Sequence, residues 1–293
     1  LQTATNPDLG CPELVGSWID IEDGIATNLG DLPVAEAVAC LVSGVQRQYA
    51  PGACGFAQPL AAVERALDAT ENAGFFRPEA GLAVVLMTEE DDCSAEDPVL
   101  YDPEAIELGV ISNFRCFEHG VRCDEEGSAP GDRHGCRERT LAEGGLLRPT
   151  TDVAMRIGQF KGNRPVVVAI ASGPATDAAG QPVTATVALD GSQHPQLQPI
   201  CTQDQLHAVP AFRLAAFQAQ FHSDGLFETV CGSSSQLDEL MVSLTNRIVA
   251  NSVYRCLPEP PADMDPDAEG LQVDCDVLDL VNSIKSKLED AKR

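Results

Sequence analysis

Residues 83–92 of the chain read AVVLMTEEDD. The first five residues are apolar without interruption, which is typical of a β-strand covered on both faces, as in a parallel sheet between helices. A threonine and four carboxylates follow directly, from Thr88 onward. Because ligands bind beyond the carboxyl ends of strands in open parallel sheets, the polar half of this stretch falls where a site would lie.

Helical and strand patterns alternate along the rest of the chain. Apolar residues at helical spacing predict helices over 33–49, 57–70, 151–159, 209–221 and 235–250. A second unbroken apolar run, PVVVAI at 165–170, predicts another buried strand, and the alternating segment VTATVAL at 183–189 predicts an edge hairpin. This alternation predicts an α/β fold with a doubly wound, mainly parallel sheet flanked by helices.

Residues 93–149 interrupt the alternation with four cysteines, seven glycines and little periodicity. They predict a long insertion pinned by disulfides. The whole chain holds 11 cysteines and no CxxC pair, which favours disulfides in an oxidising compartment. We therefore expect a secreted, periplasmic or cell-surface protein. Three pairs of cysteines are close enough in sequence to form disulfides: Cys40 with Cys54, Cys123 with Cys136, and Cys201 with Cys231. Spacing alone does not fix the connectivity.

The 293 residues carry 19 Lys and Arg against 45 Asp and Glu, a net charge of −26. This charge repels phosphate backbones, so no nucleic-acid partner is expected. No apolar run approaches the roughly 18 residues that a membrane-spanning helix needs. We expect one domain over 1–256, followed over 257–293 by an acidic, proline-rich linker and a short C-terminal helix.

The order of several segments resembles the von Willebrand factor A-like domains of secreted and lipoprotein-type bacterial proteins. The resemblance rests on GACGFAQPL at 52–60, NAGFFRP at 72–78, MTEEDDCS at 87–94, FRCFE at 114–118 and VVVAIASGP at 166–174. It implies a Rossmann-like three-layer sandwich with a metal-ion-dependent adhesion site at its carboxyl edge. It also implies a protein or glycan partner whose carboxylate completes the metal's coordination shell.

The family builds its metal site from an Asp-x-Ser-x-Ser loop, a threonine at a helix start and an aspartate at a strand end. By this resemblance we expect Thr88, Glu89 and Asp91 to bind Mg²⁺ or Ca²⁺, with Glu89 as the strand-end ligand. Glutamate stands where the family usually has aspartate, and a Ca²⁺ shell tolerates that change better than Mg²⁺ does. The helix-start region at 55–58 has no threonine. We expect the first loop, and a lipid anchor if there is one, to precede Leu1 in a longer precursor.

Two other patterns could carry chemistry. Cys54, at a predicted helix start, is a candidate thiol nucleophile. A candidate zinc cluster, whose spacing matches no usual finger, consists of Cys116, His119, Cys123, His134 and Cys136. No Gly-x-Ser-x-Gly, Walker-type or His-Glu-x-x-His motif is present. We expect a binding or adhesion domain and not an enzyme. The alternatives are a structural cell-envelope protein with a degenerate metal site and, more weakly supported, a zinc or thiol hydrolase.

Overall fold

The computed structural model describes residues 18–40 except 23, 24 and 31, and residues 55–253 except 178, 204 and 205. The chain divides into two compact units, Leu1–Ala250 and Asn251–Arg293. The predicted linker and C-terminal helix at 257–293 lie outside the described residues, so they stay predictions. Within the described ranges, no helix combines the length and the apolar character needed to cross a membrane.

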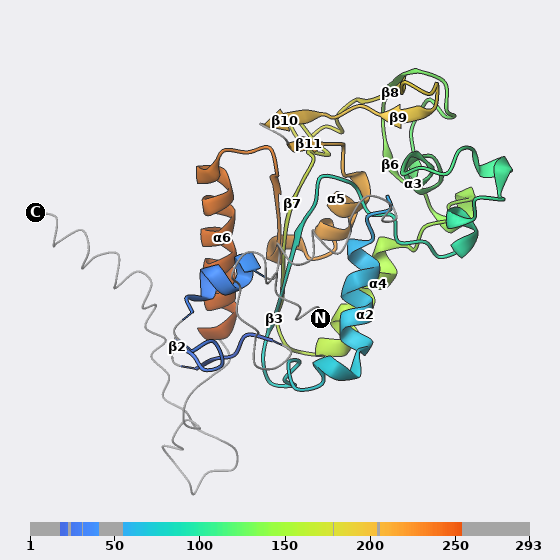
Figure 1. The fold of residues 1–293 in the computed structure, drawn as a ribbon. Coiled ribbons are helices and arrows are strands. Elements are labelled where there is room, and N and C mark those ends of the chain that lie inside the picture. The colour runs from blue at the N-terminus through green and yellow to red at the C-terminus, as the bar shows by residue number, and fades with distance from the viewer. Residues whose placement is uncertain are drawn as a thin grey trace, which may run out of the picture. The chain divides into compact units, whose positions relative to one another are not determined.

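A three-stranded parallel sheet lies at the centre of the first unit (Figure 1). Its strands are β3 (Leu82–Met87), β7 (Val166–Ser172) and β12 (Gly225–Thr229), in the spatial order β12-β7-β3. β3 and β7 confirm the two strands predicted from unbroken apolar runs. β12 was not predicted from the sequence, because its segment GLFET is short and mixed in polarity.

Helices cover both faces of this sheet, so the predicted helix–sheet–helix layering is present (Figure 1). On one face lie α2 (Pro59–Asp68), α4 (Thr150–Lys161) and α5 (Phe212–Ala219), and on the other lies α6 (Ser234–Val253). All four match helices that the apolar spacing predicts, and residues 34–40 are helical as well. The side chains of β7 alternate between the two layers, since Val168 and Ile170 pack with α2, α4 and α5, whereas Val167 and Ala169 pack with α6.

β3 is covered on only one face in the described part of the chain. Val84 and Leu86 are buried beneath α2 and α4, whereas Val85 and Met87 are 43% and 64% exposed. α6 packs over β7 and the loop after β12, which leaves the outer face of β3 exposed among the described residues. The unbroken apolar run thus predicts the strand correctly, but it does not distinguish a strand covered on both faces from one covered on a single face.

The predicted insertion at 93–149 contains regular structure. Its elements are α3 (Phe114–Gly120), β4 (Val121–Arg122), β5 (Gly131–Arg133), β6 (Arg137–Glu138) and three 3-10 turns at Pro98–Tyr101, Ile106–Leu108 and Leu141–Glu143. Disulfides join Cys93 to Cys116 and Cys123 to Cys136, so disulfides pin the segment as expected. Its elements are short, and for that reason the sequence shows little periodicity there.

A second, antiparallel sheet joins the insertion to the segment after β7. β5 pairs with β8 (Ala185–Leu189), which pairs with β9 (Pro195–Leu197). The predicted hairpin therefore forms, but β8 is the middle strand and not an edge strand, because β5 of the insertion pairs along its other side. Phe114 and Phe117 pack with residues of this sheet to form a separate core.

A short hairpin covers the carboxyl edge of the parallel sheet. Its strands are β10 (Cys201–Gln203) and β11 (Leu206–Ala208), and the predicted Cys201–Cys231 disulfide ties it to the loop after β12. The backbone amide of Val209 donates to the carbonyl of Glu89 at 3.0 Å. A Cβ at Gly173 would lie 1.9 Å from the carbonyl oxygen of Val209, so only glycine allows this close approach.

The remaining short elements are β1 (Ile21–Glu22), β2 (Ile25–Ala26), and the 3-10 turns Thr70–Asn72 and His222–Asp224. β1 and β2 form an antiparallel hairpin. The indole of Trp18, just before it, packs so closely on Gly74 that a Cβ there would lie 2.6 Å from the ring. This contact holds the hairpin against the turn that precedes β3.

Candidate functional site

Asp91, one of the predicted metal ligands, caps the start of α5. Its carboxylate accepts hydrogen bonds from the backbone amides of Arg213 at 2.9 Å and Leu214 at 3.0 Å, and from that of Asp92 at 2.8 Å. The first amides of a helix have no partner within the helix, and a carboxylate there also interacts favourably with the helix dipole. Asp91 therefore supplies a cap that α5 lacks in its own sequence, because the residue before the helix is Ala211.

Asp92 and Ser94 do the same for α2. The Asp92 carboxylate accepts from the backbone amide of Leu60 at 3.1 Å, and the Ser94 hydroxyl accepts from that of Ala61 at 2.8 Å. The same hydroxyl donates to Asp92 at 2.6 Å. Both side chains are buried, at 1% and 0% exposure. The loop after β3 thus fixes the start of a helix more than 30 residues earlier in the chain.

Glu138 of β6 caps the third helix on this face, α4. It accepts hydrogen bonds from the backbone amide of Thr150 at 2.8 Å and from its hydroxyl at 2.6 Å. The residue before α4 is Pro149, which provides no side-chain cap. Three helices that carry no cap of their own are therefore capped by carboxylates from distant parts of the sequence.

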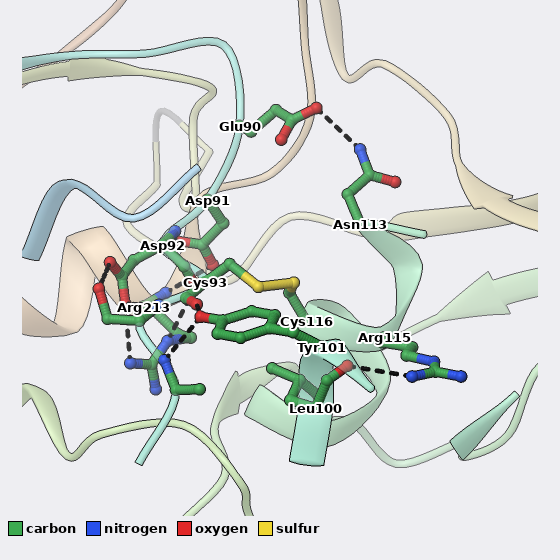
Figure 2. Close-up of a disulfide and its surroundings, with 12 residues drawn as sticks. Glu90, Asp91, Asp92, Cys93, Leu100, Tyr101, Asn113, Arg115, Cys116 and Arg213 are labelled. Carbon is green, nitrogen blue, oxygen red and sulfur yellow. Dashed lines mark hydrogen bonds and ion pairs between the residues drawn. A yellow bond between two sulfur atoms is a disulfide. The ribbon is translucent and has the colours of Figure 1, made fainter. Parts of the chain in front are cut away.

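Arg213 joins these caps through a guanidinium that is wholly buried. It donates to the carboxylate of Asp92 at 3.0 Å and to that of Glu138 at 3.1 Å, and it also donates to two backbone carbonyls. Charge-assisted hydrogen bonds of this kind are about twice as strong as neutral ones. We call this set, Asp91, Asp92, Ser94, Glu138 and Arg213, the capping network; Figure 2 shows Arg213 beside the two aspartates.

The three predicted metal ligands have separate partners. The Thr88 hydroxyl exchanges hydrogen bonds with the backbone of Glu90 at 3.0 and 3.1 Å, and exposed Glu89 accepts from the backbone amide of His207 at 3.3 Å. Backbone amides donate to both oxygens of Asp91, so the contacts of the three side chains do not gather them around one common position. Among the described residues, no group of three or more His, Cys, Asp or Glu side chains is gathered as a metal site would be. Whether the chain binds a divalent cation is a question for the unfolding experiment given below.

The cysteines of the candidate zinc cluster form disulfides. Cys123 pairs with Cys136, as sequence proximity suggests, and Cys116 pairs with Cys93, a pairing that the sequence did not suggest. These cysteines have no thiolate to offer a zinc ion, so the zinc alternative loses three of its five ligands. Cys40 is also disulfide-bonded. Its suggested partner, Cys54, lies outside the described residues, as does the thiol-nucleophile hypothesis that rests on it.

A pocket of about 80 Å³ lies beside the Cys93–Cys116 disulfide, at the carboxyl end of β3. We call it the Glu90 pocket. It is lined by Glu90, Asp91, Asp92, Cys93, Asn113, Phe114, Cys116, Phe117, Gln196, Leu197 and Val209. The loop after β3, α3, β9 and the segment after β11 each supply part of its wall, so it exists only in the folded chain.

The Glu90 carboxylate is the acid of this pocket that the capping network does not use. It accepts a hydrogen bond from the side-chain amide of Asn113 at 2.8 Å, drawn as a dashed line in Figure 2. Burial raises the pKa of Glu90 above its usual value; the Asn113 hydrogen bond opposes the rise, and the negative charge of Glu89 adds to it. A cation brought to this carboxylate would favour its ionised form.

Buried hydrogen bonds hold the pocket wall in place. The Tyr101 hydroxyl donates to the carbonyl of Cys93 and accepts from the amide of Ala95 at 3.0 Å. The Arg115 guanidinium, 1% exposed, donates to the carbonyls of Leu100, Asp102, Ala105 and Gly109. These bonds fasten the segment before α3 to the helix, and Figure 2 shows the Tyr101 ring next to the disulfide, with the Arg115 guanidinium farther from it. The pocket is therefore preformed.

The acidic run after β3 is visible in the sequence, but the residues that pair with it in the fold are not. Asn113, Gln196 and Val209 carry no pattern that predicts a site. Arg213 does carry one, since it lies between Phe212 and Leu214 on a predicted apolar helix, and a charge in that position indicates a buried partner. That partner lies about 120 residues away and could not be named from spacing.

Substituting Arg213 tests the capping network. We expect Arg213→Met to lower the free energy of unfolding by about 3–5 kcal/mol, because it leaves the buried carboxylate of Asp92 and the partly buried one of Glu138 without their cation. Arg122→Met is the matched control, since Arg122 is 44% exposed and its ion pairs should contribute less than about 1 kcal/mol. Urea unfolding followed by circular dichroism measures both. Equal losses for the two variants would contradict the role of Arg213.

Asp91 gives stability a specific pH dependence. Burial raises its pKa from 3.8 to about 6, while the amides of Arg213 and Leu214 and the Arg213 charge limit the rise. Between these two pH values the folded state keeps a proton on Asp91 that the unfolded state loses. Protonation of Asp91 therefore adds about 3 kcal/mol to the free energy of unfolding below pH 3.8, and this stabilisation is lost as the pH rises through about 6. In Asp91→Asn, the free energy of unfolding measured in urea should not show this decrease between pH 3.8 and about 6. Parallel pH profiles for the two proteins would rule it out.

Divalent cations test the predicted metal ligands. Because Thr88, Glu89 and Asp91 have separate partners, we expect millimolar Ca²⁺ or Mg²⁺ to leave the thermal unfolding midpoint of the chain at its value in EDTA. A ligand that binds only the folded state raises the midpoint by mass action. A rise that disappears in Glu89→Ala would contradict this expectation and support the cation-dependent site that the sequence suggests.

Known proteins offer no independent assignment for this site. No protein-family model matches the chain, and neither the curated proteins nor the solved structures give a match. The resemblance of sequence segments to von Willebrand factor A-like domains is therefore not supported by a family match. The chemistry of the Glu90 pocket is inferred from its own residues.

Proposed function

We propose that this chain is the binding domain of an extracellular protein and that it engages a protein ligand at the Glu90 pocket. The pocket together with the more open hollows beside it carries the proposal. The pocket itself, at about 80 Å³, is several times the ~10–15 Å³ that one water needs and smaller than the ~300–1,000 Å³ typical of pockets for organic ligands, whereas the adjoining hollows reach that range. The pocket suits the end of one side chain, and the hollows suit the neighbouring residues of the same protein ligand.

The fold and the compartment support this proposal. We propose that the fold is von Willebrand factor A-like. The parallel sheet with helices on both faces is consistent with the architecture that the sequence resemblance implies. The disulfides Cys93–Cys116, Cys123–Cys136 and Cys201–Cys231 are consistent with an extracellular protein. We propose binding and not catalysis, because Asp91 and Asp92 are committed to the capping network, which leaves Glu90 as the pocket's available carboxylate.

Two shallower hollows adjoin the Glu90 pocket and give an extended ligand room on either side. One, of about 450 Å³, shares Asn113 with the pocket, and the other, of about 560 Å³, shares Glu90 with it. Both hollows are lined by Phe56 and Gln58. A peptide segment that places one side chain in the Glu90 pocket would have its neighbouring residues over these hollows.

Selection from a random-sequence peptide display library tests the proposed function. Peptides enriched on the wild-type chain should lose at least tenfold in affinity on Asn113→Trp, which covers the mouth of the pocket. Asn113 is exposed and caps no helix amide, so the variant should fold. Asn163→Trp, at the amino end of β7, is the matched control and should bind like wild type. No enrichment, or peptides that bind Asn113→Trp equally well, would refute the proposal.

A further inference from the structure

The lining of the Glu90 pocket carries charge of one sign. Among the described residues, three carboxylates line it, those of Glu90, Asp91 and Asp92, and no Lys, Arg or His side chain does. Asp92 is neutralised by Arg213 at 3.0 Å, whereas the side-chain partner of Glu90 in this part of the chain is the neutral amide of Asn113. The charge of −26 on the whole chain adds a long-range attraction for cations. A group that enters this pocket should therefore be positive.

The polar groups of the pocket suit an organic cation better than a metal ion. Ca²⁺ takes about six to eight oxygen ligands and Mg²⁺ demands an octahedral shell. Here Glu90 provides one carboxylate, one of whose oxygens accepts from the side-chain amide of Asn113, and Gln196 adds a neutral amide to the lining. A single carboxylate beside neutral amides can pair with an ammonium group or accept a bidentate pair from a guanidinium.

The other walls of the pocket are apolar. They consist of the Phe114 and Phe117 rings, the side chains of Leu197 and Val209, and the Cys93–Cys116 disulfide. A hydrated metal ion gains nothing from such walls, but the methylene stem of a basic side chain buries apolar surface against them. Aromatic rings also attract ammonium and guanidinium groups. Acid at the mouth and apolar walls together match the shape of a basic side chain.

We propose that the Glu90 pocket receives the side chain of a lysine or arginine of the protein ligand, with Glu90 pairing its charge and the apolar walls packing its stem. This assignment rests on the proposed function and names the residue type that the pocket selects. It also differs from the metal-bridged carboxylate that the family resemblance implies, because here the ligand provides the positive charge and the domain the negative charge.

Small-molecule probes test this assignment on the whole chain. The probes are N-acetyl-lysine methylamide, its arginine counterpart and, as the neutral isostere of lysine, N-acetyl-norleucine methylamide. In an NMR titration the two cationic probes should shift the side-chain amide signal of Asn113 saturably, whereas the norleucine probe should not. Added salt should weaken the binding, because part of it is an ion pair at a partly exposed site. Equal binding of the lysine and norleucine probes would overturn the assignment.

Two variants locate the effect at the pocket. Glu90→Gln removes the charge, and we expect it to weaken binding of the lysine probe about tenfold or more, as for a lost charge-assisted hydrogen bond. Gln196→Lys, on exposed β9, should abolish binding by placing a basic side chain of the chain itself at the pocket. Glu107→Gln, an exposed glutamate in a 3-10 turn outside the pocket, removes the same charge and should leave binding unchanged. An unaffected Glu90→Gln would refute the assignment.

The peptide selection separates this assignment from the proposed function. If the selected peptides share a lysine or arginine and lose binding when it is replaced by norleucine, both proposals hold. If the peptides depend on the pocket but share no basic residue, the proposed function stands and the basic-side-chain assignment fails. If no peptide depends on the pocket, the proposed function fails, and binding of the free lysine probe then reports the chemistry of the pocket alone.

Discussion

The buried guanidinium of Arg213 is the interaction on which the rest of this structure depends. It is held between the carboxylates of Asp92 and Glu138, and these two side chains cap α2 and α4. Its own backbone amide is capped by Asp91 at the start of α5. One side chain thus fixes where three helices begin relative to the parallel sheet. Since buried charges are costly unless paired, loss of one partner leaves the charge of the other uncompensated.

This network changes the meaning of the acidic run after β3. From the sequence, Thr88, Glu89 and Asp91 are neighbours at a strand end, and a shared cation is a reasonable hypothesis. In the fold, Asp91 and Asp92 accept hydrogen bonds from the starts of helices, and Glu89 accepts one from the hairpin that covers the sheet edge. Glu90 lines the pocket. These neighbours in sequence therefore have three different structural roles, and Glu90 is the pocket carboxylate that is paired with a neutral amide.

The Cys93–Cys116 disulfide holds two walls of the pocket together. Cys93 directly follows the capping aspartates, and its bond to Cys116 places α3 against the end of β3. Tyr101 and Arg115 then fasten the segment between the two cysteines through backbone carbonyls. A preformed pocket loses little conformational entropy when a ligand enters, which favours binding by a site as small as this one. The disulfide and these hydrogen bonds together hold the wall of the pocket in place.

The sequence by itself determined the elements that depend on local pattern. Unbroken apolar runs predicted β3 and β7, helical spacing predicted α2, α4, α5 and α6, and cysteine density predicted the disulfides. Only the tertiary structure decided that β12 completes the sheet, that Cys116 pairs with Cys93, and that Arg213 meets Asp92 across about 120 residues. The physical reason is that periodicity reports which face of an element is buried, whereas the partner of a charge or a thiol depends on how distant elements pack.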